Sequence, residues 1–268
     1  MANTTLSIAV MSGKGGVGKT NLSLNLACGL YQAGYTALLM DCDLGLANLD
    51  VLLGIIPEGN LQHALMGQMP LSKVLYPVEP RGFDVLPAAS GVPELVDLSP
   101  EMRHELLQKL EPVFSGYDYV FMDLGAGISD TVQSFAAMAA MRLVVITPEP
   151  TSLTDSYAFM KVLSTRHAMK DFMVVVNQAG SAREAQAAFD KLKGACAHFL
   201  KFEPVLLGHV RTDAKLTEAV CRQQPLMRYA PGSPAAQDME KIAARLQKCR
   251  LAMLDQLAQR PVLQDPAL

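Results

Sequence analysis

Short runs of apolar residues alternate along most of the chain with longer segments in which apolar positions recur every three or four residues. Short continuous runs are typical of strands covered on both faces of a parallel sheet, and the longer pattern is typical of helices packed on those faces. The alternation predicts an α/β fold, a doubly wound and mostly parallel sheet with helices on both faces. The predicted strands are residues 6–11, 36–40, 83–86, 117–122, 142–147, 172–176 and 205–210.

Two helices have clear boundary signals. Residues 21–33 carry leucines at a spacing of four and end before Gly34, which favours a helix that stops there. A second helix is expected to begin at Ser99-Pro100, with Ser99 as its N-cap. Residues 57–80 are the least regular stretch and are expected to carry short helices.

The composition is that of an ordered globular protein. The chain has 268 residues, of which 50% are hydrophobic and 18% charged, so it can bury a core without disulfides and is not expected to be disordered. Five cysteines without a C-x-x-C pair disfavour a disulfide framework or a zinc site. Because no linker interrupts the pattern, residues 1–258 are expected to form one domain. Residues 259–268, with two prolines, are expected to form a loose tail.

Charge and hydropathy restrict the location and the class of partner. The net charge of −3 disfavours a general nucleic-acid binder, although a local basic patch remains compatible with it. The N-terminus has no signal-peptide pattern, and no stretch reaches the roughly 18 apolar residues that a transmembrane helix needs. The chain is therefore expected to be cytoplasmic.

A glycine-rich motif of the form G-x-x-x-x-G-K-[ST] follows the first predicted strand and precedes the first predicted helix. Glycines let the backbone approach phosphate oxygens, and the N–H groups at the start of the helix attract them. Lys19 is expected to reach the β- and γ-phosphates, and the Thr20 hydroxyl to bind Mg²⁺. The expected nucleotide-binding residues are Gly13, Lys14, Gly15, Gly16, Val17, Gly18, Lys19 and Thr20.

The same motif contains a second lysine, Lys14, and so resembles the deviant Walker A motif of the MinD/ParA superfamily of dimerising ATPases. The resemblance implies a P-loop NTPase fold, ATP and Mg²⁺ as cofactors, and slow hydrolysis that separates an ATP-dependent homodimer. It also implies that Lys14 reaches across the dimer to the partner's nucleotide. A cation supplied in this way would stabilise charge that grows on the γ-phosphoryl group.

Three aspartates lie at the carboxyl ends of predicted strands, where doubly wound sheets bind ligands: Asp41 and Asp43 after residues 36–40, and Asp123 after residues 117–122. By itself an Asp-x-Asp pair more often forms a turn or a helix cap, but its place one crossover after a P-loop favours a role in the site. In the superfamily's pattern Asp43 positions the attacking water, and Asp41 and Asp123 lie at the Mg²⁺ with Thr20.

Two later segments resemble other parts of the superfamily's site. Residues 124–127 occupy the second switch, although the family more often has Ser or Thr, then Pro or Ala, where Leu124 and Gly125 stand. Residues 147–152 resemble the Pro-Glu segment at the dimer face, and a simple proline-rich turn is the alternative.

The adenine pocket is the last part of the site for which the resemblance suggests residues. Asn177 matches an asparagine that hydrogen-bonds the adenine edge, although the residue alone could equally cap a helix. Residues 208–213 would form the other wall, with Arg211 and Asp213 as candidates. Most members have proline where Arg211 stands, so the contacts of this segment differ from the family pattern.

Four strings resemble the flagellar-number regulators of the superfamily, the FlhG, FleN or YlxH branch: residues 43–50, 87–91, 98–100 and 148–157. The first of these strings is shared with MinD, and the other three favour the flagellar branch. This resemblance implies a switch that regulates flagellar number or placement. The implied partners are the flagellar GTPase FlhF, flagellar switch (C-ring) proteins or a flagellar transcription factor. Division-site placement of the MinD type and DNA partition of the ParA type are the alternatives. An iron–sulfur reductase is disfavoured because no cysteine lies in residues 87–97 or 123–130.

The last predicted helix has an apolar stripe at helical spacing, with basic residues beside it. Such a helix either packs its stripe on the domain core or lies on a membrane surface. The second possibility would place the protein peripherally at the inner membrane or a cell pole. The stripe consists of Met239, Ile242, Leu246, Cys249, Met253 and Leu257.

Overall fold

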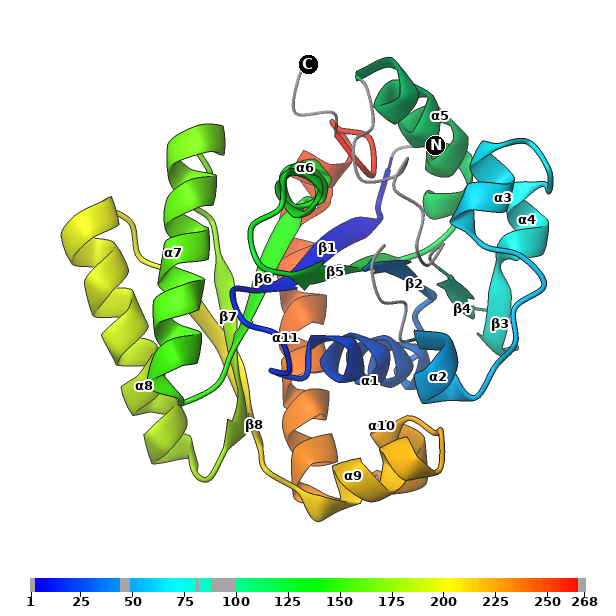
Figure 1. The fold of residues 1–268 in the computed structure, drawn as a ribbon. Coiled ribbons are helices and arrows are strands. Elements are labelled where there is room, and N and C mark those ends of the chain that lie inside the picture. Colours follow the sequence, from blue (N-terminus) through cyan, green and yellow to red (C-terminus); the bar gives the residue numbers. More distant parts are fainter. Residues whose placement is uncertain (1–2, 44–48, 81, 88–99, 265–268) are drawn as a thin grey trace.

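The computed structural model describes residues 3–43, 49–80, 82–87 and 100–264, and within them one sheet of eight strands forms the centre of the molecule (Figure 1). The strand order is β3-β4-β2-β5-β1-β6-β7-β8, and all neighbours are parallel except β3 and β4. The strands are β1 Leu6–Ser12, β2 Ala37–Cys42, β3 Tyr76–Glu79, β4 Phe83–Leu86, β5 Tyr119–Ala126, β6 Met141–Ile146, β7 Met173–Ala179 and β8 Val205–Arg211.

Helices cover both faces of this sheet, which confirms the predicted α/β architecture (Figure 1). α1, α10 and α11 pack on one face, and α5 to α8 pack on the other. The start of α5 lies at Pro100, whereas Ser99, its expected N-cap, is outside the described residues. The helices are α1 Lys19–Gln32, α2 Leu49–Leu53, α3 Leu61–Leu65, α4 Leu71–Val74, α5 Pro100–Phe114, α6 Asp130–Met138, α7 Pro150–His167, α8 Ala182–Ala195 with the π-helix Cys196–Leu200, α9 Ala214–Cys221, α10 Leu226–Tyr229 and α11 Pro234–Leu257.

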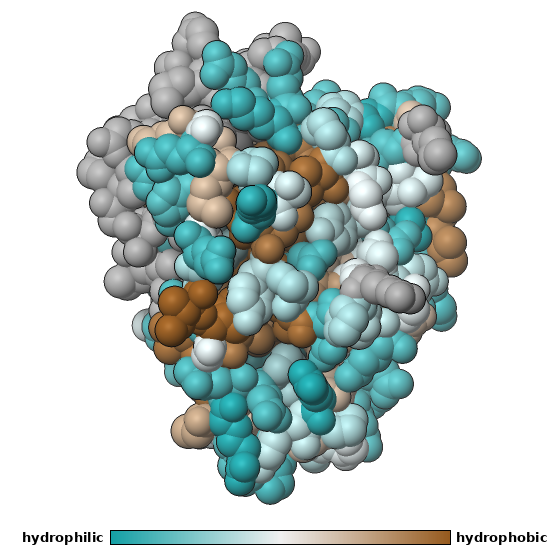
Figure 2. Space-filling model, turned by 90° about the vertical axis from the view of Figure 1, so that its right-hand side faces the viewer, coloured by the Kyte–Doolittle hydropathy of each residue, from teal (hydrophilic) through white to brown (hydrophobic). Residues whose placement is uncertain are grey.

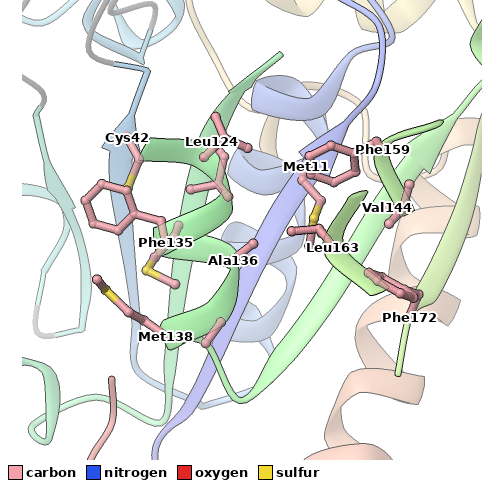
Figure 3. Packing of buried hydrophobic residues seen from close by; sticks show 14 of the residues in the cluster. Met11, Cys42, Leu124, Phe135, Ala136, Met138, Val144, Phe159, Leu163 and Phe172 are labelled. Atoms are coloured by element: carbon pink, nitrogen blue, oxygen red, sulfur yellow. The ribbon is translucent and has the colours of Figure 1, made fainter. Parts of the chain in front are cut away.

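The central strands are buried on both faces, which explains their continuous apolar runs. In β1 all seven residues are buried, and Ala9 and Met11 face one hydrophobic cluster while Ile8 and Val10 face the other. Figure 3 shows Phe159 of α7 close to Met11 within the first of these clusters. Full burial of each large apolar side chain contributes about 1.5–3 kcal/mol. This packing fixes the strands that carry the functional loops.

The edge strand β3 is the element that the sequence pattern did not reveal. Residues 57–80 were expected to carry short helices only, and α3 and α4 do form there, but Tyr76–Glu79 pairs antiparallel with β4. Pro77 lacks a backbone N–H, and strands tolerate proline at a sheet edge because no second neighbour needs that donor. The strand therefore depends on its pairing with β4 more than on its own sequence.

The prediction of a loose tail is wrong for residues 259–264. Val262 and Leu263 are only 1% and 3% exposed and belong to the first hydrophobic cluster. The Ser7 hydroxyl donates to the Val262 carbonyl at 2.6 Å, and the Glu111 carboxylate accepts the Val262 N–H at 3.0 Å. Both backbone groups of Val262 are thus hydrogen-bonded, which holds this apolar segment against the sheet. Residues 265–268 lie outside the described part.

Helix α11 packs its apolar stripe on the sheet. Met239, Ile242, Leu246 and Leu257 are at most 1% exposed, and the remaining two stripe residues are partly buried against the same cluster. Packing on the core is thus the alternative that the structure supports for this helix. Among the described helices, none combines the length and the apolarity required to cross a bilayer.

Apolar side chains also reach the surface near the β3 edge of the sheet. Figure 2 views the molecule from the side on which α2, α3 and α4 lie in Figure 1, and shows apolar patches among the hydrophilic surface. Val51 of α2, together with Ile56 and Met66 in the segments that follow α2 and α3, is exposed: the three residues are 65%, 93% and 55% exposed. Exposed apolar surface of this kind is common where proteins bind partners.

Candidate nucleotide site

The loop between β1 and α1 has the backbone conformation of a phosphate-binding turn. Gly16 and Gly18 have φ angles of 77° and 86°, which favour glycine because a side chain would be strained there. Helix α1 starts at Lys19 directly after the turn. Its first N–H groups and its dipole therefore point toward a common space at the carboxyl end of β1, where an anion would be stabilised.

Two neighbouring elements support this loop closely. A Cβ on Gly13 would overlap the Asp155 carbonyl of α7 and would lie 2.6 Å from the backbone nitrogen of Ser156. A Cβ on Gly18 would lie 2.5 Å from the side-chain nitrogen of Asn177. Both glycines are thus required by the packing around the loop as well as by any phosphate.

Asn177 connects the end of β7 to the same loop. Its side chain is 3% exposed, and its amide nitrogen donates to the Val17 carbonyl at 2.8 Å. The sequence placed this residue at the adenine, and the structure places it beneath the P-loop. Its role toward adenine stays a prediction.

Lys14 lies at the outer side of the turn and binds the start of α7. Its ammonium group is 2.6 Å from the Glu149 carboxylate and donates to the Thr151 hydroxyl at 3.0 Å. The Lys14 side chain is 37% exposed, so it borders solvent rather than the core. Residues 147–152, expected at a dimer face, therefore contact the second lysine of the loop within one chain.

The carboxylates Asp41 and Asp123 lie side by side because they are register partners on β2 and β5. Asp123 accepts hydrogen bonds from the hydroxyls of Thr20 and Ser23, the latter at 3.2 Å, and Lys19 lies close enough to influence it. Burial raises the pKa of Asp123 to about 6, and these hydroxyls and Lys19 oppose that shift. Lys19 and Thr20 of the loop motif thus lie beside the Asp123 carboxylate.

These residues fit Mg²⁺ as it is usually bound beside phosphates. Such a site needs one or two carboxylates and a hydroxyl, with phosphate and water oxygens completing six ligands. Thr20, Asp41 and Asp123 offer that set, and the described residues form no cluster of three or more His, Cys, Asp or Glu side chains that would hold a metal alone. Thr20, Asp41 and Asp123 as ligands remain a prediction.

Asp43 faces the second switch. Its backbone N–H donates to the Asp41 carboxylate at 3.0 Å, and a Cβ on Gly125 would lie 3.4 Å from an Asp43 carboxylate oxygen. Leu124, the other departure from the family pattern, is 1% exposed and packs in the core. A core position explains the apolar residue at 124, and Gly125 lies next to the Asp43 carboxylate.

Ser23 is a site residue that sequence analysis missed. It lies one turn beyond Thr20 on α1, and its hydroxyl contacts the Lys19 carbonyl as well as Asp123. Its spacing from Lys19 and Thr20 places it on the same helix face, which is the signal that could have identified it.

The candidates Arg211 and Asp213 are held by the start of α11. The Arg211 guanidinium forms a two-point ion pair with Asp238, with contacts of 2.6 and 3.0 Å. Asp213 caps α9 through the Lys215 N–H and also accepts the Ala235 N–H at 3.0 Å. Both side chains thus fasten the loop after β8 to α11, and contacts to adenine by these two residues stay untested.

The family of this protein follows from comparison with known proteins. A model of the ParA family, described as NUBPL iron-transfer P-loop NTPase, matches residues 3–247. The chain belongs to the ParA family of P-loop NTPases. Antiactivator FleN of Pseudomonas aeruginosa is 39% identical over 239 residues, which are 89% of this chain and 85% of FleN. Flagellum site-determining protein YlxH of Helicobacter pylori is 35% identical over 243 residues, which are 90% of this chain and 82% of YlxH.

Solved structures agree with this place in the ParA family. A chain of the MinC:MinD cell division protein complex of Aquifex aeolicus matches with a TM-score of 0.74 and 28% identity, over 91% of this chain and 96% of that one. Septum site-determining protein MinD of Pyrococcus horikoshii, complexed with Mg-ADP, matches with a TM-score of 0.75 and 27% identity, over 91% and 97%. The predicted resemblance to the superfamily and to its flagellar branch is therefore confirmed.

Burial of the Asp123 carboxylate predicts that this ParA-family protein is stabilised when the charge is removed. The pKa of Asp123 rises from an ordinary 3.8 to about 6 on folding. This shift corresponds to about 2–3 kcal/mol of destabilisation when the carboxyl is ionised. Asp123→Asn should therefore raise the melting temperature of the nucleotide-free protein by roughly 5–10 °C at pH 7.5.

The increase in melting temperature of Asp123→Asn over the wild type should become smaller as the pH falls. As the pH falls through about 6, the folded wild type takes up a proton at Asp123 and loses its penalty. Below the ordinary pKa of 3.8 the unfolded chain is protonated too, so the difference between the two proteins should vanish near pH 4. Calorimetry in a chelator across this range measures the difference, and equal melting temperatures at pH 7.5 would contradict the prediction.

Proposed function

We propose that the protein is a slow, Mg²⁺-dependent ATPase that dimerises on binding ATP and regulates flagellar number or placement through partner proteins. The observation that carries this proposal is Lys14, a second P-loop lysine whose ammonium group borders solvent beside the loop. The flagellar part rests on two relatives whose names are antiactivator FleN and flagellum site-determining protein YlxH.

The residues around the loop divide the chemistry among them. Bound ATP and Mg²⁺ would supply a γ-phosphoryl group whose oxygens gain negative charge during transfer. Lys19 and the first N–H groups of α1 bind the phosphates, and Thr20, Asp41 and Asp123 hold the ion. Asp43 orients the attacking water from its place beside Gly125. Lys14 of a second copy adds the charge that completes the site.

Lys14 must leave Glu149 before it can reach across a dimer. An ion pair this exposed contributes about 0.2–1 kcal/mol, so its release costs little compared with a contact to a triphosphate. The pair therefore holds Lys14 in place in a single chain without opposing dimer formation strongly.

The adenine is proposed to lie between the ends of β7 and β8. The side-chain nitrogen of Asn177 donates a hydrogen bond to the Val17 carbonyl. The side-chain oxygen Oδ1 is therefore the atom that would accept a hydrogen bond from the adenine amino group. The side chains of Arg211 and Asp213 bind α11, and the Arg211 N–H also donates to Asp238, so Arg211 would contact adenine through its carbonyl and Asp213 through its N–H.

The proposed partners are the flagellar GTPase FlhF, C-ring proteins or a flagellar transcription factor. ATP would control their binding if the dimer and the monomer differ in affinity for them. Peripheral contact with the inner membrane or a cell pole would need a surface other than the α11 stripe, which is buried. Division-site placement is the alternative role, and the likeness to MinD structures supports it.

The mass of the protein in solution tests the switch. With Mg²⁺ and a non-hydrolysable ATP analogue, light scattering should give twice the monomer mass, and with ADP the monomer mass. Lys14→Ala should remain monomeric with the analogue. Lys193→Ala is the matched control, because Lys193 forms a similarly exposed ion pair with Glu203 at 2.9 Å and should not affect dimerisation. A wild-type protein that stays monomeric with the analogue would overturn the proposal.

Counting flagella tests the biological role. Cells that lack the gene should show an altered number or position of flagella, and the wild-type gene and Lys193→Ala should restore them. Lys14→Ala should not restore them. Normal flagella together with misplaced division septa would favour the MinD-like alternative.

A further inference from the structure

A pocket of about 430 Å³ lies at the amino ends of the strands, whereas the P-loop lies at their carboxyl ends. It is formed where β6, β7 and β8 begin and is bounded by the last turns of α11 and by Arg260. Figure 1 shows where these strands and α11 lie. Its volume lies within the range of small-ligand sites. We call it the basal pocket; its lining is Ala140, Met141, Arg142, Lys170, Asp171, Phe172, Met173, Glu203, Val205, Met253, Gln256, Leu257 and Arg260.

Two guanidinium groups in the basal pocket are bound mainly to neutral groups. Arg142 donates to the carbonyls of Asp171 and Ala139, each at 3.3 Å, and Arg260 donates to the Met138 carbonyl at 3.0 Å. The Nε of Arg260 is buried and has no hydrogen-bond partner in the described chain. A buried donor without an acceptor is costly, so a small shift of the Arg260 side chain that brings Nε to a ligand acceptor in the pocket would be stabilising.

The two arginines also repel each other. Burial lowers the pKa of Arg260, and the neighbouring charge of Arg142 lowers it further, although Glu111 opposes these shifts. Burial lowers the pKa of Arg142 as well, although Asp171 opposes that shift. Like charges held together in a partly buried place favour the binding of an anion between them.

The acidic residues of the lining do not cancel this charge. Glu203 is already paired with Lys193, which lies outside the lining, at 2.9 Å. Asp171 is exposed and is the remaining acidic residue among three lining cations, Arg142, Arg260 and the exposed Lys170. Glu111, outside the lining, also acts on Arg260, so three cations face two carboxylates. The basal pocket therefore retains an excess of positive charge.

The rest of the lining is largely apolar. Met141, Phe172 and Leu257 are 5%, 2% and 0% exposed, and Met173 and Met253 extend the same wall. Methionine side chains adapt to ligands of irregular shape. An apolar wall beside the two arginines, Arg142 and Arg260, suits a molecule that has an apolar body and one anionic group such as a carboxylate or a phosphate.

We propose that the basal pocket binds an amphiphilic anion, a short apolar chain that carries a carboxylate or a phosphate, with Arg142 and Arg260 holding the charged group. The proposal is independent of ATP binding, because the pocket lies at the amino ends of the strands and the P-loop at their carboxyl ends.

Four probes in titration calorimetry test the chemistry on the full chain. Octanoate and octyl phosphate present the two charged groups on one apolar chain, octanol lacks the charge, and inorganic phosphate lacks the chain. At least one of the amphiphilic anions should bind with a Kd of about 1 mM or tighter. The tighter of the two identifies the charged group, and octanol and phosphate should each bind at least about tenfold more weakly.

Variants locate the binding. Arg260→Gln should weaken binding of the amphiphilic anion by about tenfold or more, because the substitution removes a charge-assisted contact. Lys170→Glu, at an exposed position that tolerates substitution, should weaken it severalfold even if Arg260→Gln fails to fold. Arg183→Gln on the exposed side of α8 is the control and should bind as wild type does.

Each outcome decides the proposal. Saturating Mg-ADP should leave the affinity unchanged, and displacement by ADP would assign the binding to the P-loop and overturn the proposal. Equal binding of octanol, absence of binding by both anions, or wild-type affinity in both Arg260→Gln and Lys170→Glu would also overturn it. Fluorescent ADP should bind these variants normally, which shows that they are folded.

Discussion

Asp43→Ala is expected to trap the ATP-bound protein as a dimer and to slow hydrolysis by about 100-fold or more, the usual loss when a group that positions a nucleophile is removed. Asp43 stands beside Gly125 of the second switch, and its expected role is to position water rather than to bind the phosphates. ATP affinity should therefore change little. Phosphate release under single-turnover conditions and light scattering with ATP measure the two effects.

Asp50→Ala provides the control for this variant. Asp50 lies a few residues further along, at the start of α2, where its carboxylate accepts the Val51 N–H at 2.7 Å. The Asp50→Ala protein should hydrolyse ATP at nearly the wild-type rate. If Asp43→Ala also turned over normally, Asp43 would have no part in positioning water.

Gly13→Ala is expected to have the largest effect on stability. The new methyl group would overlap the Asp155 carbonyl of α7, and backbone atoms cannot move aside as a flexible side chain can. Overpacking costs typically 1–3 kcal/mol, and a backbone clash belongs at or beyond the upper end. The melting temperature should fall by roughly 5–10 °C, and nucleotide binding should be lost because the loop is displaced.

Gly15→Ala separates this clash from a general intolerance of the loop. A Cβ at Gly15 would be 3.9 Å from its nearest neighbour, the Cβ of Ala126, and Gly15 does not have a positive φ. The nucleotide-free Gly15→Ala protein should melt within about 2 °C of wild type. A comparable loss in both variants would mean that the contact with α7 is not the cause.

The parts of the fold that depend on local pattern were predictable from the sequence. Strands buried on both faces have continuous apolar runs, so β1 and its neighbours were found within a few residues. The glycine motif, with Asp123 after a buried strand, was equally recognisable because its spacing reflects a fixed turn. Strand β3 could not be predicted in this way, because an edge strand is specified by its partner strand and Pro77 is untypical of a strand.

Contacts between distant segments were the part that could not be predicted. The pairing of Arg211 with Asp238 and the support of the P-loop by Asn177 join residues whose side chains give no sign of their partners. The tail was misjudged for the same reason. Its prolines indicated a loose end, but Val262 is held by Ser7 and Glu111, which lie far away in the sequence.

The docking of Val262 also decides where a label can be attached. The Gln264 N–H bonds the Met138 carbonyl, so the chain is fixed up to that residue at the amino ends of the strands. A fluorescent protein joined directly after Gln264 would therefore start from the amino ends of the strands, away from the P-loop. Microscopy of such a fusion should report the behaviour of an unobstructed nucleotide face.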